Sequence, residues 1–433
     1  MEDILFTGLV VVIVNGGCNT GRSLAIGFAA REAKVVVHGP KHVVDVTIEE
    51  VHSLGSGGLG CQENPIEAAM EKFGRIDIVA IVARPSTRAE TFNDSIERLV
   101  YKTYIDAMYG YTYLNGIGHG NLLIVVDYED EGVAYATARK SLMGMCISLA
   151  NESNDIKCNC ILAVDKKARK NVALVVMALT VPPWGYSGCT MEVNSTLAQQ
   201  LVFNENVSYT YSSSSPSVDQ MLKSCLAMPS MREKVAIVTG AGSGLGLLVA
   251  RRLVEFGARV VAYESNMMIR TIPQLVAIRP NFKRKESWVE SILSIPEPKE
   301  KPKEERYVYI NSMDEEEMVK TCISKFGRVD ILINCPSIPT NSWHQDLVPF
   351  YFEMAIHHHI KASYRISQHV WPSMSKQKDG RIVNLIPMDQ ARPSLLSLGM
   401  AGLSQALAEK GIHENIHVTW AISSASVSET NFL

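Results

Sequence analysis

Two glycine-rich stretches, each preceded by an apolar run, lie far apart in this 433-residue chain. The second reads Val235-Ala-Ile-Val-Thr-Gly-Ala-Gly-Ser-Gly-Leu-Gly246, and the first reads Val11-Val-Ile-Val-Asn-Gly-Gly-Cys-Asn-Thr-Gly21. An apolar run that passes through glycines into a helical pattern predicts a buried strand, a tight turn and the N-terminus of a helix. The two stretches predict that the chain is a tandem repeat of one α/β unit.

Further matches follow in the same order along the chain. Lys72-Phe-Gly-Arg-Ile-Asp-Ile78 is matched by Lys325-Phe-Gly-Arg-Val-Asp-Ile331, and Gly144 is matched by Gly402. The later copy also carries an inserted stretch, roughly residues 270 to 305, that is rich in proline, lysine and glutamate. Such a composition predicts a solvated surface segment.

The composition is that of an ordinary globular protein, with 46% hydrophobic and 20% charged residues. A chain of this length is expected to form two domains. A net charge of −3 offers no basic surface for nucleic acid. The nine cysteines lack CxxC pairs, which predicts buried thiols in a reducing compartment and no metal site. We predict a domain over residues 1–205, a linker over 206–230 and a second domain over 231–433.

The longest early apolar run, Ile4 to Val14, is interrupted by Thr7 and Gly8. It is too short to cross a membrane and predicts a first strand instead. We therefore expect a soluble, intracellular protein.

The later glycine loop has the pattern of a dinucleotide site. Glycines let the backbone approach a pyrophosphate closely, and the helix N-terminus supplies free amide donors. Glu264 ends the next apolar run, about 18 residues after the loop, where its carboxylate can bind a ribose hydroxyl and favour NAD over a 2′-phosphorylated cofactor. The alternative is that the loop is only a tight turn. The expected cofactor contacts are Thr239, Gly240, Gly242, Ser243, Gly244, Leu245, Gly246 and Glu264.

The earlier loop, Asn15 to Gly21, fits this role poorly. It is expected to be one residue shorter, and Cys18, Asn19 and Thr20 place side chains in the path of the phosphates. The apolar run that follows ends at His38-Gly39 without an acid. We predict that this copy does not bind the cofactor.

Together with Gly380-Arg-Ile-Val-Asn384, these motifs resemble the short-chain dehydrogenase/reductase family over nearly the whole chain, twice. The resemblance implies two tandem Rossmann-like domains, each a doubly wound parallel sheet with helices on both faces. Compared with the first, the second domain is expected to be truncated after a strand at Ile416 to Ile422. The resemblance also implies docking of the two domains as an intramolecular pseudo-dimer, with further self- or hetero-association left open.

Two such domains in tandem most resemble the (3R)-3-hydroxyacyl-CoA dehydrogenase region of fungal peroxisomal multifunctional β-oxidation enzymes. That resemblance implies peroxisomes, although Thr430-Asn-Phe-Leu433 is not a Ser-Lys-Leu type signal, so the cytoplasm stays open.

The family implies a catalytic serine, tyrosine, lysine and asparagine. In the first copy Tyr135 takes the tyrosine place and Arg139, followed by Lys140, takes the lysine place. Arginine keeps the charge but not the shape of lysine. Asp127 stands for the serine and Asp106 for the asparagine, so that only Tyr135 is kept.

The second copy keeps none of the four. Pro387 stands for the serine and Lys361 for the asparagine, while Pro393 and Ser397 replace the tyrosine and lysine. The adjacent histidines 357–359 point in different directions on a helix, which argues against a metal site. Asn311 and Asn334 are expected to contact the cofactor.

Three hypotheses for the function follow. The first is a member of the NAD-dependent 3-hydroxyacyl-CoA dehydrogenase line that binds NAD in the second domain with weak or no catalysis, a pseudoenzyme of fatty acid β-oxidation. The second is an active oxidoreductase in which Tyr135 acts with Arg139 on a 3-hydroxyacyl-CoA or a similar alcohol. The third is a scaffold or regulatory partner of an intact relative, without a ligand.

Overall fold

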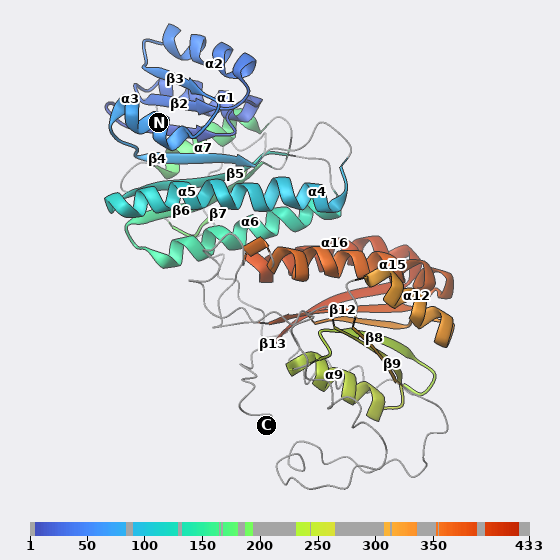
Figure 1. Ribbon diagram of the computed structural model, residues 1–433. Coiled ribbons are helices and arrows are strands. Elements are labelled where there is room, and N and C mark those ends of the chain that lie inside the picture. Colours follow the sequence, from blue (N-terminus) through green and yellow to red (C-terminus); the bar gives the residue numbers. More distant parts are fainter. Residues whose placement is uncertain are drawn as a thin grey trace. The chain divides into compact units, whose positions relative to one another are not determined.

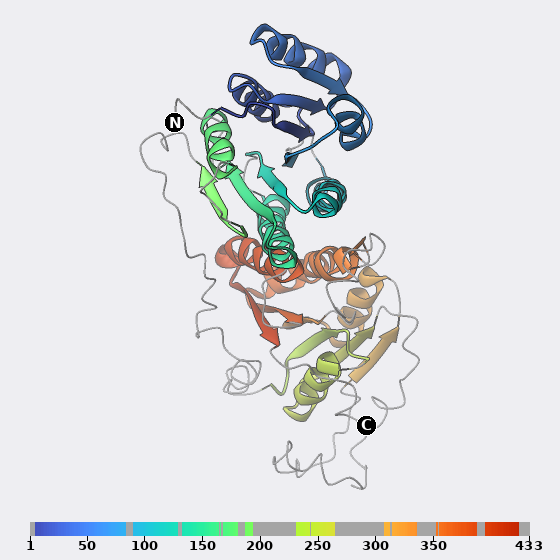
Figure 2. The same ribbon diagram turned by 90° about the vertical axis from the view of Figure 1, so that its left-hand side faces the viewer.

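The computed structural model describes residues 5–83, 90–128, 132–163, 165, 168–180, 187–193, 231–242, 244–264, 307–311, 314–335, 352–353, 355–387 and 395–423. The chain divides into two compact units, the first comprising residues 1–212, 347–353 and 393–403 and the second the remainder. The predicted linker, 206–230, and the inserted stretch, 270–305, lie outside the described residues. Each sheet is described by itself below, as the first half (β1 to β7) and the second half (β8 to β13) of the chain (Figures 1 and 2).

The first half contains a parallel sheet of seven strands in the order β3-β2-β1-β4-β5-β6-β7. Its strands are β1 Val10–Val14, β2 Lys34–His38, β3 Gly58–Cys61, β4 Ile78–Ala83, β5 Gly120–Val126, β6 Ile156–Ala163 and β7 Thr190–Val193. Both β1 and β4 are buried throughout, as expected for strands covered on both faces. The first strand is shorter than predicted, because residues 7 and 8 form a turn in which Gly8 has a φ of 82°.

Helices cover the faces of this sheet. They are α1 Asn19–Ala29, α2 Lys41–Ser53, α3 Pro65–Phe73, α4 Phe92–Ile96, the π-helix η1 Glu97–Tyr101, α5 Lys102–Ile117, α6 Val133–Glu152 and α7 Arg169–Leu179. Leu24 and Phe28 of α1 and Val172 and Val176 of α7 share one core with the strands. In Figure 1 α5 and α6 lie on the opposite face from α7.

The second half contains a parallel sheet of six strands in the order β10-β9-β8-β11-β12-β13. These are β8 Val235–Thr239, β9 Arg259–Glu264, β10 Tyr307–Asn311, β11 Ile331–Asn334, β12 Gly380–Pro387 and β13 Ile416–Ser423. The helices are α9 Gly244–Glu255, α12 Glu315–Phe326, the π-helix η3 Ile356–Lys361, α15 Ala362–Gln377, α16 Leu395–Gly411 and the short 3-10 helix η4 Ile412–Glu414. The predicted pair of doubly wound parallel sheets is confirmed, and the second is the smaller in the described part of the chain.

Alternation along the strands sorts the second sheet into two faces. Ala236, Val238 and Ile333 pack with α9 in one apolar core. Because successive side chains of a strand point to opposite faces, Thr239 and Asn334 lie on the other face. That face is covered by α15, which contacts β11 and β12.

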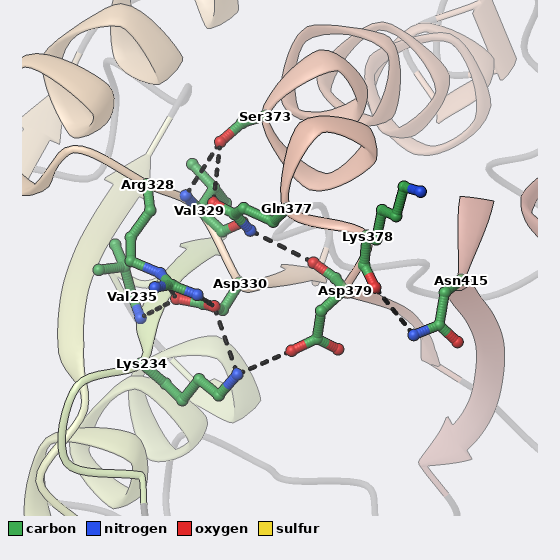
Figure 3. Close-up of polar contacts among 10 residues, drawn as sticks. All are labelled: Lys234, Val235, Arg328, Val329, Asp330, Ser373, Gln377, Lys378, Asp379 and Asn415. Carbon is green, nitrogen blue, oxygen red and sulfur yellow. Dashed lines mark hydrogen bonds and ion pairs between the residues drawn. The ribbon is translucent and has the colours of Figure 1, made fainter.

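A buried aspartate at the amino edge of each sheet binds the first residue of the central strand. Asp330 Oδ2 accepts the Val235 N–H at 2.8 Å, and Arg328 Nη2 and Lys234 Nζ lie 2.6 and 3.4 Å from Asp330 Oδ1 (Figure 3). In the first half Asp77 Oδ2 accepts the Val10 N–H at 2.8 Å and pairs with Arg75. The two matched Phe-Gly-Arg-x-Asp runs therefore make the same contact in both halves.

No helix in the described ranges is long and apolar enough to cross a bilayer.

Candidate nucleotide-binding site

The glycine loop of the second half joins β8 to α9 through two close approaches. A Cβ on Gly246 would overlap the carbonyl oxygen of Gly240, and a Cβ on Gly242 would lie 2.9 Å from Glu264 Oε2. Only glycine fits at position 246, because a Cβ there would meet the backbone, whereas a Cβ at position 242 would displace the Glu264 carboxylate. The start of α9 therefore packs closely on the end of β8. Gly244 begins α9, Leu245 is partly buried against its core, and Ser243 lies outside the described residues.

Glu264, at the carboxyl end of β9, lies beside this loop. Its side chain is fully buried, and its Oε2 accepts the Gly242 N–H at 3.3 Å. The structure thus brings together two residues that the sequence analysis placed in one site. Asn311 ends β10 and pairs with Glu264 across the two strands. Nothing is described of the Asn311 side chain.

Asn334, at the end of β11, belongs to a buried chain of hydrogen bonds. Its Nδ2 donates to Asn384 Oδ1 at 2.8 Å, and Asn384 Nδ2 donates to Ser404 Oγ at 2.7 Å. The Asn334 Oδ1 atom is buried without a hydrogen-bond partner. Thr239 Oγ1 accepts the Cys335 N–H at 3.0 Å, which ties β11 to the start of the loop. Sequence reasoning missed Asn384 and Ser404, because a polar residue inside an apolar strand gives no sign of its partner.

The two glycine loops have the same length, so the prediction of a shorter first loop was wrong. Val10 pairs with Lys34 and Val235 pairs with Arg259, and α1 and α9 begin at equivalent positions, Asn19 and Gly244. In this register Asn15 stands where Gly240 stands. The sequence misled because the first motif begins with the adjacent pair Gly16-Gly17, and either glycine can be aligned with Gly240.

Side chains of the first half occupy its own loop. Asn15 Nδ2 donates to Asp106 Oδ2 at 3.1 Å, and the Asn15 N–H donates to His38 Nδ1 at 3.3 Å. Cys18 Sγ accepts the Gly21 N–H at 3.4 Å and so caps α1. Burial raises the pKa of Asp106, an effect opposed by Lys102. Burial, and then the charge of Lys102, lowers the pKa of His38.

Tyr135 is buried on α6, and its hydroxyl donates to the carbonyl oxygen of Asp127 at 2.8 Å. The guanidinium of Arg139 lies over the tyrosine ring, 5.7 Å from its centroid, and pairs with Glu192 of β7 at 3.2 Å. The structure thus brings the two predicted catalytic residues together as a cation and an aromatic face. In this arrangement the phenol hydroxyl uses its hydrogen bond on the backbone.

The residues that the sequence analysis placed at the catalytic positions of the second half are two prolines, a serine and a lysine. Pro387 ends β12, Ser397 is buried in α16, Lys361 ends η3, and Pro393 lies outside the described residues. The rings of His357 and His358 meet edge to face at 5.2 Å, and burial lowers the pKa of both. Within the described ranges no three histidine, cysteine or acidic side chains are grouped to hold a metal ion.

Comparison with known proteins agrees with this architecture. The family model described as short chain dehydrogenase matches residues 307–421. The peroxisomal hydratase-dehydrogenase-epimerase of Neurospora crassa is 22% identical over 519 residues, covering 99% of this chain and 55% of that protein. The Saccharomyces cerevisiae protein of the same name is 30% identical over 198 residues, covering 44% of this chain and 21% of that protein. This chain therefore spans about half the length of these relatives at most.

Among solved structures, the C-domain of a bacterial malonyl-CoA reductase with NADP has a TM-score of 0.64 at 12% identity. The match covers 98% of this chain and 92% of that one, and it supports the fold. The family model shows that residues 307–421 belong to the short chain dehydrogenase family, and the parallel sheets of both halves agree with that fold.

Proposed function

We propose that the second half of the chain binds a nicotinamide dinucleotide, NAD, and that the protein transfers little or no hydride. The observation that carries the proposal is the contact of Gly246 with the Gly240 carbonyl, with the Glu264 carboxylate beside Gly242. A side chain at either glycine would fill the space that the backbone needs to approach a phosphate.

The residues present fit the cofactor. The amides at the start of α9 would hold the pyrophosphate, with the helix dipole favouring its charge. The Glu264 carboxylate would accept a ribose hydroxyl, and it would repel a 2′-phosphate, so NAD is favoured over NADP. Asn311 and Asn334 stand at the ends of the neighbouring strands as further contacts. When bound, the nicotinamide supplies the hydride acceptor.

Weak or absent catalysis follows from the residues around that site. The second half offers prolines at two of the family stations, neither of which can donate or accept a proton. In the first half, the Tyr135 hydroxyl donates its hydrogen bond to the Asp127 carbonyl, and Arg139 is engaged by Glu192. This disfavours the alternative in which Tyr135 and Arg139 oxidise an alcohol.

The first half would then serve as a folded partner without a cofactor. Asn15, Asp106 and Cys18 occupy the loop with their own hydrogen bonds. The equal loop length and the equivalent Asp77 and Asp330 contacts support an origin of the two halves as a tandem repeat. We assign the chain to the 3-hydroxyacyl-CoA dehydrogenase line on the resemblance of its tandem motifs. The names of its relatives, peroxisomal hydratase-dehydrogenase-epimerases, support a dehydrogenase and peroxisomes.

Calorimetric titration with NAD⁺ and NADH tests the proposal, with NADH formation from a 3-hydroxyacyl-CoA followed in the same samples. Gly244→Arg puts a bulky cation at the start of α9, and Asn19→Arg is its matched control at the equivalent position of α1. We expect wild type and Asn19→Arg to bind and Gly244→Arg not to bind, without turnover.

Turnover that Tyr135→Phe abolishes would overturn the proposal in favour of an active oxidoreductase. An absence of binding by wild type would overturn it in favour of the scaffold.

A further inference from the structure

Among the described residues of the second half, the buried polar atoms without a hydrogen-bond partner include the Tyr263 hydroxyl, Asn334 Oδ1 and His359 Nε2. Their residues are 2%, 1% and 1% exposed. Buried polar atoms in folded proteins are nearly always paired, because leaving one unpaired forfeits its hydration without return. An unpaired buried atom near a ligand cradle therefore points to a partner supplied by the ligand.

All three residues lie toward the carboxyl edge of the second sheet, where the glycine loop is. Tyr263 and Asn334 are at the ends of β9 and β11, on the face opposite α9. His359 is in η3, which runs directly into α15, and α15 leads into β12 and packs on β11 and β12. A helix that connects parallel strands runs antiparallel to them. The η3 end of this helix is therefore at the carboxyl edge.

The surroundings of η3 place it near the ribose-binding acid. Burial lowers the pKa of His358, and so do the nearby charges of His357 and Arg365. The charges of Glu315 on α12 and Glu264 on β9 oppose this shift. Burial, followed by the charge of His358, lowers the pKa of His359 to about 4. At neutral pH His359 is thus an uncharged imidazole that can donate or accept a hydrogen bond.

The first half provides an internal comparison. Lys102 precedes β5 by the same interval as Ala362 precedes β12, and a π-helix precedes each of them. In this register the equivalent of His359 is Leu99, which is 1% exposed. The equivalents of the paired Asn334 and Asn384 are Ile81 and Ile124, which also pair across β4 and β5. At the positions of His359, Asn334 and Asn384 the second half thus has polar side chains and the first half apolar ones, whereas the equivalent of Tyr263 is the polar His38.

We propose that His359 is a binding residue of the second-half site, with its Nε2 hydrogen-bonded to a polar group of the dinucleotide held by the glycine loop. This inference rests on the proposed function, because it requires that a dinucleotide binds there. The unpaired atom of His359 is satisfied only in the bound state.

The test compares His359→Leu, which reproduces the Leu99 arrangement, with His359→Gln, which keeps a polar group near the Nε2 position. His369→Leu is the control on α15, about three turns farther from the edge. Thermal unfolding without ligand and calorimetric titration with NADH are measured for each variant. We expect His359→Leu to raise the apo melting temperature by about 3 °C and to weaken NADH binding about tenfold. His359→Gln recovers most of the affinity, and His369→Leu keeps it.

Replacing a histidine with a purely structural role would not raise the melting temperature of the apo protein and weaken NADH binding at the same time. NADH affinity unchanged in His359→Leu, with wild type binding, overturns this inference and leaves the proposed function standing. Absence of NADH binding by wild type removes both. Because His359→Leu could fail to fold, the ¹⁵N resonance of His359 Nε2 in wild type is a second measurement: it shifts on addition of NADH, and a constant resonance at saturation contradicts the proposal.

Discussion

Asn15 and Gly240 occupy the same position in the two halves of the chain, and both have a left-handed backbone, with φ angles of 56° and 60°. Glycine adopts this conformation without a side chain, and asparagine is among the few other residues that tolerate it. The Asn15 side chain then donates a hydrogen bond to Asp106 on α5. The two loops thus share this backbone conformation, while Asn15 and Cys18 place hydrogen-bonding side chains in the first one.

Gly246→Ala should remove dinucleotide binding and destabilise the second half by about 2 kcal/mol, because the new methyl group would overlap the Gly240 carbonyl. Gly21→Ala is the matched variant, since its methyl group would overlap Gly16 in the same way. We expect it to destabilise the first half without changing NADH affinity. Thermal unfolding and NADH titration of both variants check this, and equal losses of affinity would contradict it.

Glu264→Ser should weaken NADH binding about tenfold, because a hydrogen bond to a charged group is lost. It should also narrow the preference for NADH over NADPH, because the carboxylate that repels a 2′-phosphate is gone. The affinities of both cofactors for wild type and variant are the measurement. A wild type that prefers NADPH would show that Glu264 does not select the cofactor.

Tyr135→Phe should leave any oxidoreductase rate unchanged and lower the free energy of unfolding by about 1 kcal/mol. The phenol hydroxyl donates to the buried Asp127 carbonyl, and its removal leaves that acceptor with one partner fewer. Urea unfolding measures the stability, and the rate of NADH formation from a 3-hydroxyacyl-CoA measures the activity. A rate lost with the hydroxyl would assign Tyr135 a catalytic role.

Asp330→Ala should lower the free energy of unfolding by about 3 kcal/mol, because it leaves the Val235 amide and Arg328 without their buried partner. Asp379→Ala is the control. Its side chain is 40% exposed and bonds only Lys234 in Figure 3, so we expect a loss below about 1 kcal/mol. Urea unfolding of both variants is compared, and similar losses would show that burial of the pair is not decisive.

The stability of wild type should fall as the pH is lowered from about 6.5 to about 4, and His359 should account for part of this. Its folded pKa lies below the ordinary value of 6.5, so the unfolded chain binds more protons in this window. The contribution is complete above pH 6.5 and is lost by about pH 4, amounting to about 3 kcal/mol. Unfolding of wild type and His359→Leu across this range is the measurement, and parallel curves would rule the histidine out.

Local patterns in the sequence were sufficient for much of the fold. The run Val235 to Gly246 predicts strand, loop and helix because its apolar and glycine residues act within a few positions of each other. Glu264 could be placed at the end of the next strand for the same reason. The parallel pairing of the strands follows from this alternation of strand and helix, and the structure confirms it.

What the sequence did not reveal depends on residues far apart along the chain. Asn15 meets Asp106 across 91 positions, and the Asn334 amide is held by Asn384 across 50. No periodicity carries such partners. The burial of His359 was likewise hidden in a run of three histidines whose neighbours look alike in sequence. The role of each site residue stays a prediction that the variants above test.

The buried aspartates make one more point about this chain. The side chains of Asp77 and Asp330 each accept a central-strand amide at the amino edge of the sheet. Their backbone carbonyls accept the amides of Asn121 on β5 and Arg381 on β12. The residues of chemical interest lie at the opposite edge. Mutations at the carboxyl edge can therefore change the site residues without disturbing the contacts at the amino edge that stabilise the sheet. A chain can in this way keep the fold of a dehydrogenase when its site residues change.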